Sequence, residues 1–128
     1  MSLRRVVVTG TGVVSAIGMD TQSFWESLRE CRPGIGPYRS VDSAQVRFKN
    51  GAEIQGYDPA AYFHNRETDL MDRFAQFAVI AAREAMGMSG LTLGEEEKTR
   101  TAVICGTSIG GVVAQAVSYT HLTLPTKA

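Results

Sequence analysis

Two short glycine-containing stretches of the sequence could carry out chemistry. For the first stretch, that chemistry would be ester hydrolysis. Gly106-Thr107-Ser108-Ile109-Gly110 fits the G-x-S-x-G pattern of a nucleophile elbow, in which Ser108 would attack the ester carbon. A serine triad also needs an acidic residue and a histidine later in the chain. No Asp or Glu follows Ser108, and the one later histidine is His121. A truncated α/β-hydrolase with Ser108 in its elbow therefore stays open as one alternative.

The second stretch, Gly10-Thr11-Gly12, could bind the phosphates of a nucleotide. It follows the apolar run 6–9, as the G-x-G-x-x-G/A fingerprint of dinucleotide-binding proteins does. That fingerprint also needs Gly or Ala at its third position and a helix that begins at once, but Ser15 stands at the third position and the pattern predicts no helix before Thr21. We interpret Gly10 and Gly12 as structural turn residues, with a nucleotide-binding module as a second alternative.

Cysteines and histidines offer little further chemistry. The cysteines are Cys31 and Cys105, and the histidines are His64 and His121. A reactive thiol needs a nearby cation or helix N-terminus. We interpret Cys105 as a small buried hydrophobe and Cys31 as incidental. His64 lacks metal-ligand spacing, so we predict no metal and no cofactor. Two cysteines do not form a disulfide framework, which favours a reducing, cytoplasmic compartment.

The elements that would position these residues alternate between strands and helices, which is typical of an α/β fold. The long helix carries apolar residues at spacings of three and four, with small alanines that predict close packing against a sheet or another helix. We interpret Gly106, Gly110 and Gly111, like Gly10 and Gly12, as turn glycines. The expected strands are two buried strands over 6–9 and 101–105 and a hairpin over 46–56 around Asn50-Gly51. The expected helices are one from Thr21, capped by Asp20 or Thr21 and stopped by Pro33-Gly34, one over 69–86, ended by Gly87 or Gly90, and one from Val112. Residues 95–98 are expected to form a solvated connector.

Composition limits the classes of function. The chain has 128 residues, of which 44% are hydrophobic, with 13 basic and 13 acidic side chains, so its formal net charge is zero. These values predict at most one globular domain. Neutral charge argues against a nucleic-acid partner. The sequence contains no run of about 18 apolar residues, so it predicts no membrane span.

The pattern breaks after Val117. Residues 118–126 are rich in threonine, with leucines two apart, and Pro125 cannot continue a helix. We predict a native region over 1–117 and a non-native tail over 118–128, translated from adapter or vector sequence.

Several segments taken together resemble the β-ketoacyl-acyl-carrier-protein synthases of the synthase II type, in the thiolase superfamily. The matching segments are 4–18, Phe24-Trp25 with Leu28, 33–36, 71–78 and 105–111. They extend from about Arg4 to Val112. The resemblance implies a partial thiolase-like layered α/β fold, with only the front of the first α/β half in this chain.

The resemblance also implies a function. Such enzymes condense an acyl thioester with malonyl-acyl-carrier protein by a decarboxylative Claisen reaction, in fatty-acid or polyketide synthesis. Acyl carrier protein and a second subunit of a homodimer would be the partners. The residue matching Ile109 lines the acyl pocket, which makes Ser108 structural, and Arg66 is the one basic residue where the family docks its carrier protein.

The family's catalytic cysteine and two histidines lie beyond the matching segments. Cys105, His64 and His121 do not match those positions, so we assign no catalytic residue and expect this chain by itself to be inactive.

Overall fold

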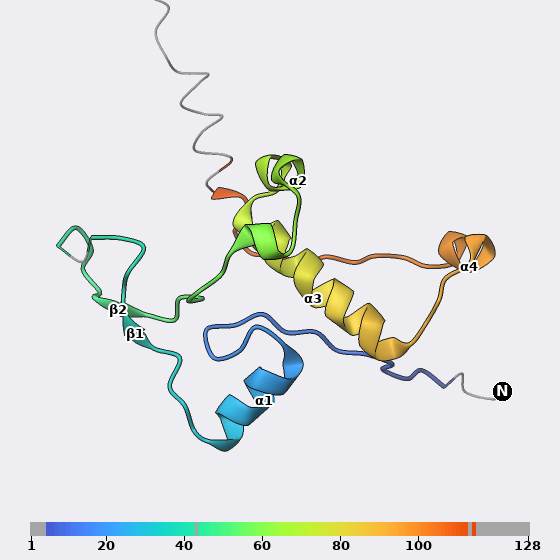
Figure 1. Cartoon of the computed structure of the whole chain (residues 1–128), viewed down its shortest axis with the longest axis horizontal. Helices are drawn as coiled ribbons and strands as arrows, with labels where there is room; N and C mark the ends of the chain where they lie inside the picture. Colours follow the sequence, from blue (N-terminus) through green and yellow to red (C-terminus); the bar gives the residue numbers. More distant parts are fainter. Residues whose placement is uncertain (1–4, 43, 113, 115–128) are drawn as a thin grey trace, which may run out of the picture. The chain divides into compact units, whose positions relative to one another are not determined.

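The computed structural model describes residues 5–42, 44–112 and 114 (Figure 1). The chain divides into two compact units, one drawn from residues 1–58 and 79–91 and the other from residues 59–78 and 92–128. Within the described residues, no helix is long and apolar enough to cross a membrane. The elements in chain order are α1 (Thr21–Arg29), β1 (Gly36–Pro37), β2 (Asn50–Gly51), a 3-10 turn (Pro59–Ala61), α2 (Asn65–Leu70), α3 (Arg73–Ser89) and α4 (Glu95–Thr99).

Helix α1 begins where the sequence predicts. Asp20 is its N-cap, and an Asp20 carboxylate oxygen accepts the backbone N–H of Ser23 at 2.7 Å. The Ser23 hydroxyl in turn accepts the N–H of Asp20 at 3.3 Å, which completes a capping box. The backbone N–H and hydroxyl of Ser23 hold the pKa of Asp20 below its ordinary value, despite the opposing effect of slight burial.

Helix α1 ends at Arg29, before Pro33. The N–H of Cys31 donates to the carbonyl of Leu28 at 3.1 Å, and the N–H of Arg32 donates to that of Ser27 at 2.9 Å. These two bonds form a Schellman motif, in which the second residue after the helix adopts a left-handed conformation. That residue is Cys31, with φ of 53°. The helix stop is therefore made by backbone hydrogen bonds rather than by the proline.

The helix predicted over 69–86 is divided in two. Helix α2 ends at Leu70, Met71 is extended, and α3 runs from Arg73 to Ser89. The pattern of apolar residues did not reveal this break. Gly87 lies inside α3, whereas Gly90 follows it with φ of 64°, so Gly90 and not Gly87 ends the helix.

The predicted strands over 6–9 and 101–105 are absent. Neither segment adopts regular secondary structure, and Val6 and Ile104 are each 93% exposed. A strand exists only when a neighbour satisfies its backbone groups, and the described part of the chain provides none for either segment. The interpretation of Cys105 as buried is also wrong, because Cys105 is exposed.

The hairpin over 46–56 is likewise wrong. Asn50-Gly51 forms β2 and pairs antiparallel with β1, in the register Gly36 with Gly51 and Pro37 with Asn50. The connector over 95–98 is helical instead, as α4. Three glutamates in the first turn of α4 and Lys98 in its last turn suit the helix dipole.

Each unit has a small core of its own. In the first, Ile80 is 7% exposed, and the buried hydroxyl of Ser27 donates to the carbonyl of Ile17 at 2.6 Å. In the second, Phe63 is 5% exposed, and the buried amide of Gln76 donates to the Met71 carbonyl at 2.8 Å. The backbone is helical at residues 112 and 114. The predicted tail, with His121, lies outside the described residues.

Candidate functional site

The segment Gly10-Thr11-Gly12 lies directly on α3. A methyl group added at Gly10 would overlap the carbonyl oxygen of Ala85, and one added at Gly12 would overlap that of Ala81. The spacings agree, because two extended residues span about 6.6 Å and four helical residues about 6 Å. The small alanines therefore pack closely, as predicted, but their partner is this glycine segment and not a sheet or another helix.

Helix α3 also holds the glycine segment through one carboxylate. Glu84 accepts the backbone N–H of Val13 at 2.8 Å and the N–H of Thr21, the first residue of α1, at 2.6 Å. Partial burial favours the neutral acid, but these two N–H donors outweigh it and hold the pKa of Glu84 below its ordinary value. The carboxylate thus connects the segment after Gly12 to the start of α1.

This geometry argues against nucleotide binding at Gly10–Gly12. A dinucleotide fingerprint keeps its glycines small so that a pyrophosphate can approach the backbone. Here the same space is occupied by the backbone of α3 at Ala81 and Ala85. The N-terminus of α1, which would have to face the phosphates, is already occupied by Glu84 at Thr21. The glycines therefore permit packing of the helix.

The sequence contains a signal for Glu84 that the prediction did not use. Ala81, Glu84, Ala85 and Met88 are spaced at three, four and seven, so the acidic residue lies on the face that carries the packing alanines. A charged residue on such a face usually has buried hydrogen-bonding partners.

The turn over 106–111 carries the predicted acyl-pocket residue. Ile109 is 77% exposed, and Gly111 has φ of 79°, a left-handed conformation that favours glycine. Gly110 packs closely, since a methyl carbon added there would lie 2.7 Å from both Phe74 Cε2 and Thr107 Oγ1. Apart from its two chain neighbours, no described residue has an atom within 4 Å of the corresponding position at Gly106.

Ser108 lacks the surroundings of a nucleophile. It lies in a bend, is exposed, and follows a segment that is not a strand. A nucleophile elbow requires a strand before the serine and a base within hydrogen-bonding reach. In the described part of the chain, the Ser108 side chain makes no hydrogen bond, so the structure does not favour the hydrolase alternative.

Arg66, His64 and both cysteines lie exposed on the surface. Arg66 is an exposed residue of α2. His64 precedes α2, and its backbone N–H donates to the carboxylate of Glu67 at 2.9 Å. Cys31 and Cys105 are exposed free thiols. Among the described residues, no three His, Cys, Asp or Glu side chains are grouped as a metal ion would need.

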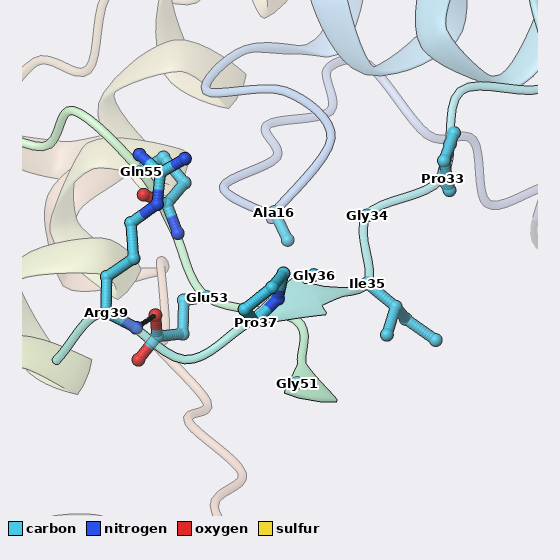
Figure 2. Close-up of a pocket in the computed structure, with 10 residues that line it drawn as sticks. All are labelled: Ala16, Pro33, Gly34, Ile35, Gly36, Pro37, Arg39, Gly51, Glu53 and Gln55. Carbon is cyan, nitrogen blue, oxygen red and sulfur yellow. Dashed lines mark hydrogen bonds between the residues drawn. The ribbon is translucent and has the colours of Figure 1, made fainter. Parts of the chain in front are cut away.

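The first unit contains a shallow pocket of about 190 Å³ (Figure 2). It is formed between the Ala16 turn and the β1–β2 pair. The Glu53 carboxylate at its edge accepts the backbone N–H of Arg39 at 2.7 Å and that of Ser40 at 3.2 Å, while the Ile35 side chain points away from it. The lining residues are Ala16, Pro33, Gly34, Ile35, Gly36, Pro37, Arg39, Gly51, Glu53 and Gln55. Glu53 therefore serves to hold the chain after β1.

Comparison with known proteins identifies the class. The family model described as "Beta-ketoacyl synthase, N-terminal domain" matches residues 3–126, and the chain belongs to this family. A solved structure titled "The ishigamide ketosynthase/chain length factor" aligns with a TM-score of 0.64 and 35% identity, covering 75% of this chain and 23% of that one. The chain is thus a partial piece of a thiolase-like fold, as the sequence predicts.

Two of the individual relatives are synthases by name. The 3-oxoacyl-[acyl-carrier-protein] synthase 2 of Synechocystis sp. is 37% identical over 109 residues, which is 85% of this chain and 26% of that protein. The oxytetracycline polyketide putative beta-ketoacyl synthase 1 of Streptomyces rimosus is 44% identical over 108 residues, which is 84% of this chain and 25% of that protein. The chain therefore spans about a quarter of the length of these relatives.

Proposed function

We propose that this chain is the N-terminal part of a β-ketoacyl-acyl-carrier-protein synthase. The enzyme would take an acyl group from a thioester onto a cysteine thiolate. Malonyl-acyl-carrier protein would then lose carbon dioxide, and the resulting carbanion would attack the acyl carbonyl and expel the thiolate. The carrying observation is that named synthases match this chain over 84–88% of its length at 34–44% identity.

Within that reaction, we assign this chain scaffold and substrate-binding roles. Ile109 supplies an apolar side chain to the acyl pocket, and its 77% exposure leaves the side chain available to a ligand. The cysteine nucleophile and the two histidines would come from elsewhere in the full-length protein. Because covalent catalysis needs the activated thiol, the chain by itself would be inactive.

The partners proposed are acyl carrier protein and a second subunit of a homodimer. Arg66 would contact the acidic carrier protein, because its guanidinium is exposed on α2. The compartment proposed is the cytoplasm, since both cysteines are free and a reducing environment would keep them so.

The proposal is tested on the full-length protein that contains this sequence. Incubation with an acyl thioester and malonyl-acyl-carrier protein should give a 3-oxoacyl product two carbons longer, detected by mass spectrometry. Absence of this product with every acyl chain tried would refute the assignment.

Two variants separate the assigned roles. Arg66→Glu should raise KM for malonyl-acyl-carrier protein and leave kcat nearly unchanged, because it removes an attraction used for docking. Ser108→Ala should retain condensation, whereas a hydrolase would lose ester cleavage. Loss of an ester-cleaving activity in Ser108→Ala, with no condensation in the parent, would favour the hydrolase.

A further inference from the structure

The ring of Phe74, near the start of α3, contacts the turn that carries Ile109. A methyl carbon added at Gly110 would lie 2.7 Å from Phe74 Cε2 and 2.9 Å from Cδ2, and one added at Gly111 would lie 3.6 Å from Cε1. At distances below 3.0 Å, the ring or the turn would have to shift to accommodate that carbon. The aromatic ring therefore packs directly on the backbone that follows Ile109.

Asp72 contacts the same part of the chain from the N-terminus of α3. One carboxylate oxygen accepts the N–H of Arg73 at 2.7 Å. The other accepts the N–H of Ala114 at 3.4 Å, a long bond, and would lie 4.0 Å from a methyl carbon at Gly111. One side chain thus contacts both the start of α3 and the backbone after the turn.

The contacts of Phe74 and Asp72 lie next to Ile109 along the chain. Its own side chain is 77% exposed and so is held by little packing of its own. The backbone on its C-terminal side is constrained by the left-handed Gly111 and by the Phe74 ring. A shift of the ring or of the turn would therefore move the Ile109 side chain.

We propose that Phe74 and Asp72 are positioning residues for Ile109 and so help to set which acyl chains the enzyme accepts. The inference rests on the proposed function, because Ile109 affects specificity only if it lines the acyl pocket. An apolar pocket distinguishes chains by about 10-fold to 200-fold per methylene. A small displacement of Ile109 would be enough to change that ratio.

The test compares Gly110→Ala with Gly106→Ala in the full-length protein. The two substitutions are chemically identical, and neither glycine has a positive φ, but only the first methyl group would overlap Phe74. We expect Gly110→Ala to speed hydrogen exchange of the amides over 106–112 about tenfold, as overpacking does. We also expect it to change the kcat/KM ratio of long to short acyl chains about tenfold. Gly106→Ala should change both by less than about twofold.

A rescue experiment identifies the contact. Adding Phe74→Leu to Gly110→Ala removes the overlap with the ring but leaves the approach to Thr107 Oγ1 at 2.7 Å, so it should return exchange and the acyl-chain ratio part of the way to those of the unmodified protein. Phe77→Leu, one turn further along α3, should not. If Gly110→Ala does not fold, Asp72→Asn takes its place. This variant should shift the kcat/KM ratio of long to short acyl chains, with normal hydrogen exchange outside residues 106–112.

Three results would overturn the inference. They are equal effects of the two glycine variants, equal rescue by the two Phe→Leu changes, and faster exchange with an unchanged acyl-chain ratio. Failure of the proposed function is distinguishable: the full-length protein would then extend no acyl chain, while the exchange measurements would still report on the Phe74 contact.

Discussion

Glu84→Gln should loosen the chain between Val13 and Thr21 while leaving α3 helical. Glutamine has nearly the helix propensity of glutamate, but it keeps only one acceptor oxygen and turns an NH₂ group towards the second backbone N–H. One of the bonds at 2.6 and 2.8 Å is therefore lost. A hydrogen bond to a charged group contributes about 1.5–3 kcal/mol, and water can replace part of it at this half-buried site, so we expect a loss of about 2 kcal/mol.

Hydrogen exchange at the two amides measures this loss locally. Since about 1.4 kcal/mol corresponds to tenfold, the amides of Val13 and Thr21 should exchange about 30-fold faster in Glu84→Gln. Glu96→Gln is the matched control, because Glu96 is an exposed residue of α4 and its loss should change stability by at most about 0.5 kcal/mol. Unchanged exchange at Val13 and Thr21 in Glu84→Gln would show that the carboxylate does not hold this segment.

Three further results are expected. Because the folded-state pKa of Glu84 lies below its ordinary 4.5, its stabilisation is present above pH 4.5 and lost as the pH falls through the folded-state pKa; exchange at Thr21, compared with Glu84→Gln at each pH, should show this loss. Gly12→Ala should destabilise by about 1–3 kcal/mol through overlap with α3, whereas Gly87→Ala, in open space on α3, should stabilise by about 1 kcal/mol in urea titrations. Cys31→Gly should stabilise by about 1 kcal/mol, because Cys31 has φ of 53°, and a lower urea midpoint would contradict this.

Local signals in the sequence predicted helix ends well. Asp20 begins α1 because a short side chain can reach the backbone three residues on, and Gly90 ends α3 because it adopts a left-handed conformation. The division between α2 and α3 was missed, since apolar spacing continues across Met71 and gives no sign of its extended backbone.

Signals that depend on distant partners failed. The β-branched runs over 6–9 and 101–105 have the composition of buried strands, but pairing needs neighbours that the described residues do not supply. Asn50-Gly51 has the composition of a hairpin turn, yet it pairs with β1.

The glycines of the candidate site show the same contrast between local signals and contacts with distant residues. Their importance was predicted from clustering, but Gly10 and Gly12 are needed for close approach to α3, and only contact with Ala81 and Ala85 reveals that reason. The position of Phe74 on Gly110 likewise requires knowledge of the tertiary structure.

The most direct test of the account measures release of carbon dioxide from malonyl-acyl-carrier protein by two samples, this 128-residue chain and the full-length protein that contains it. The proposed function predicts release coupled to formation of the 3-oxoacyl product by the full-length protein alone, because the proposal assigns the cysteine nucleophile to a part of the enzyme outside this chain. Turnover by the chain itself, or none by either sample, would contradict it.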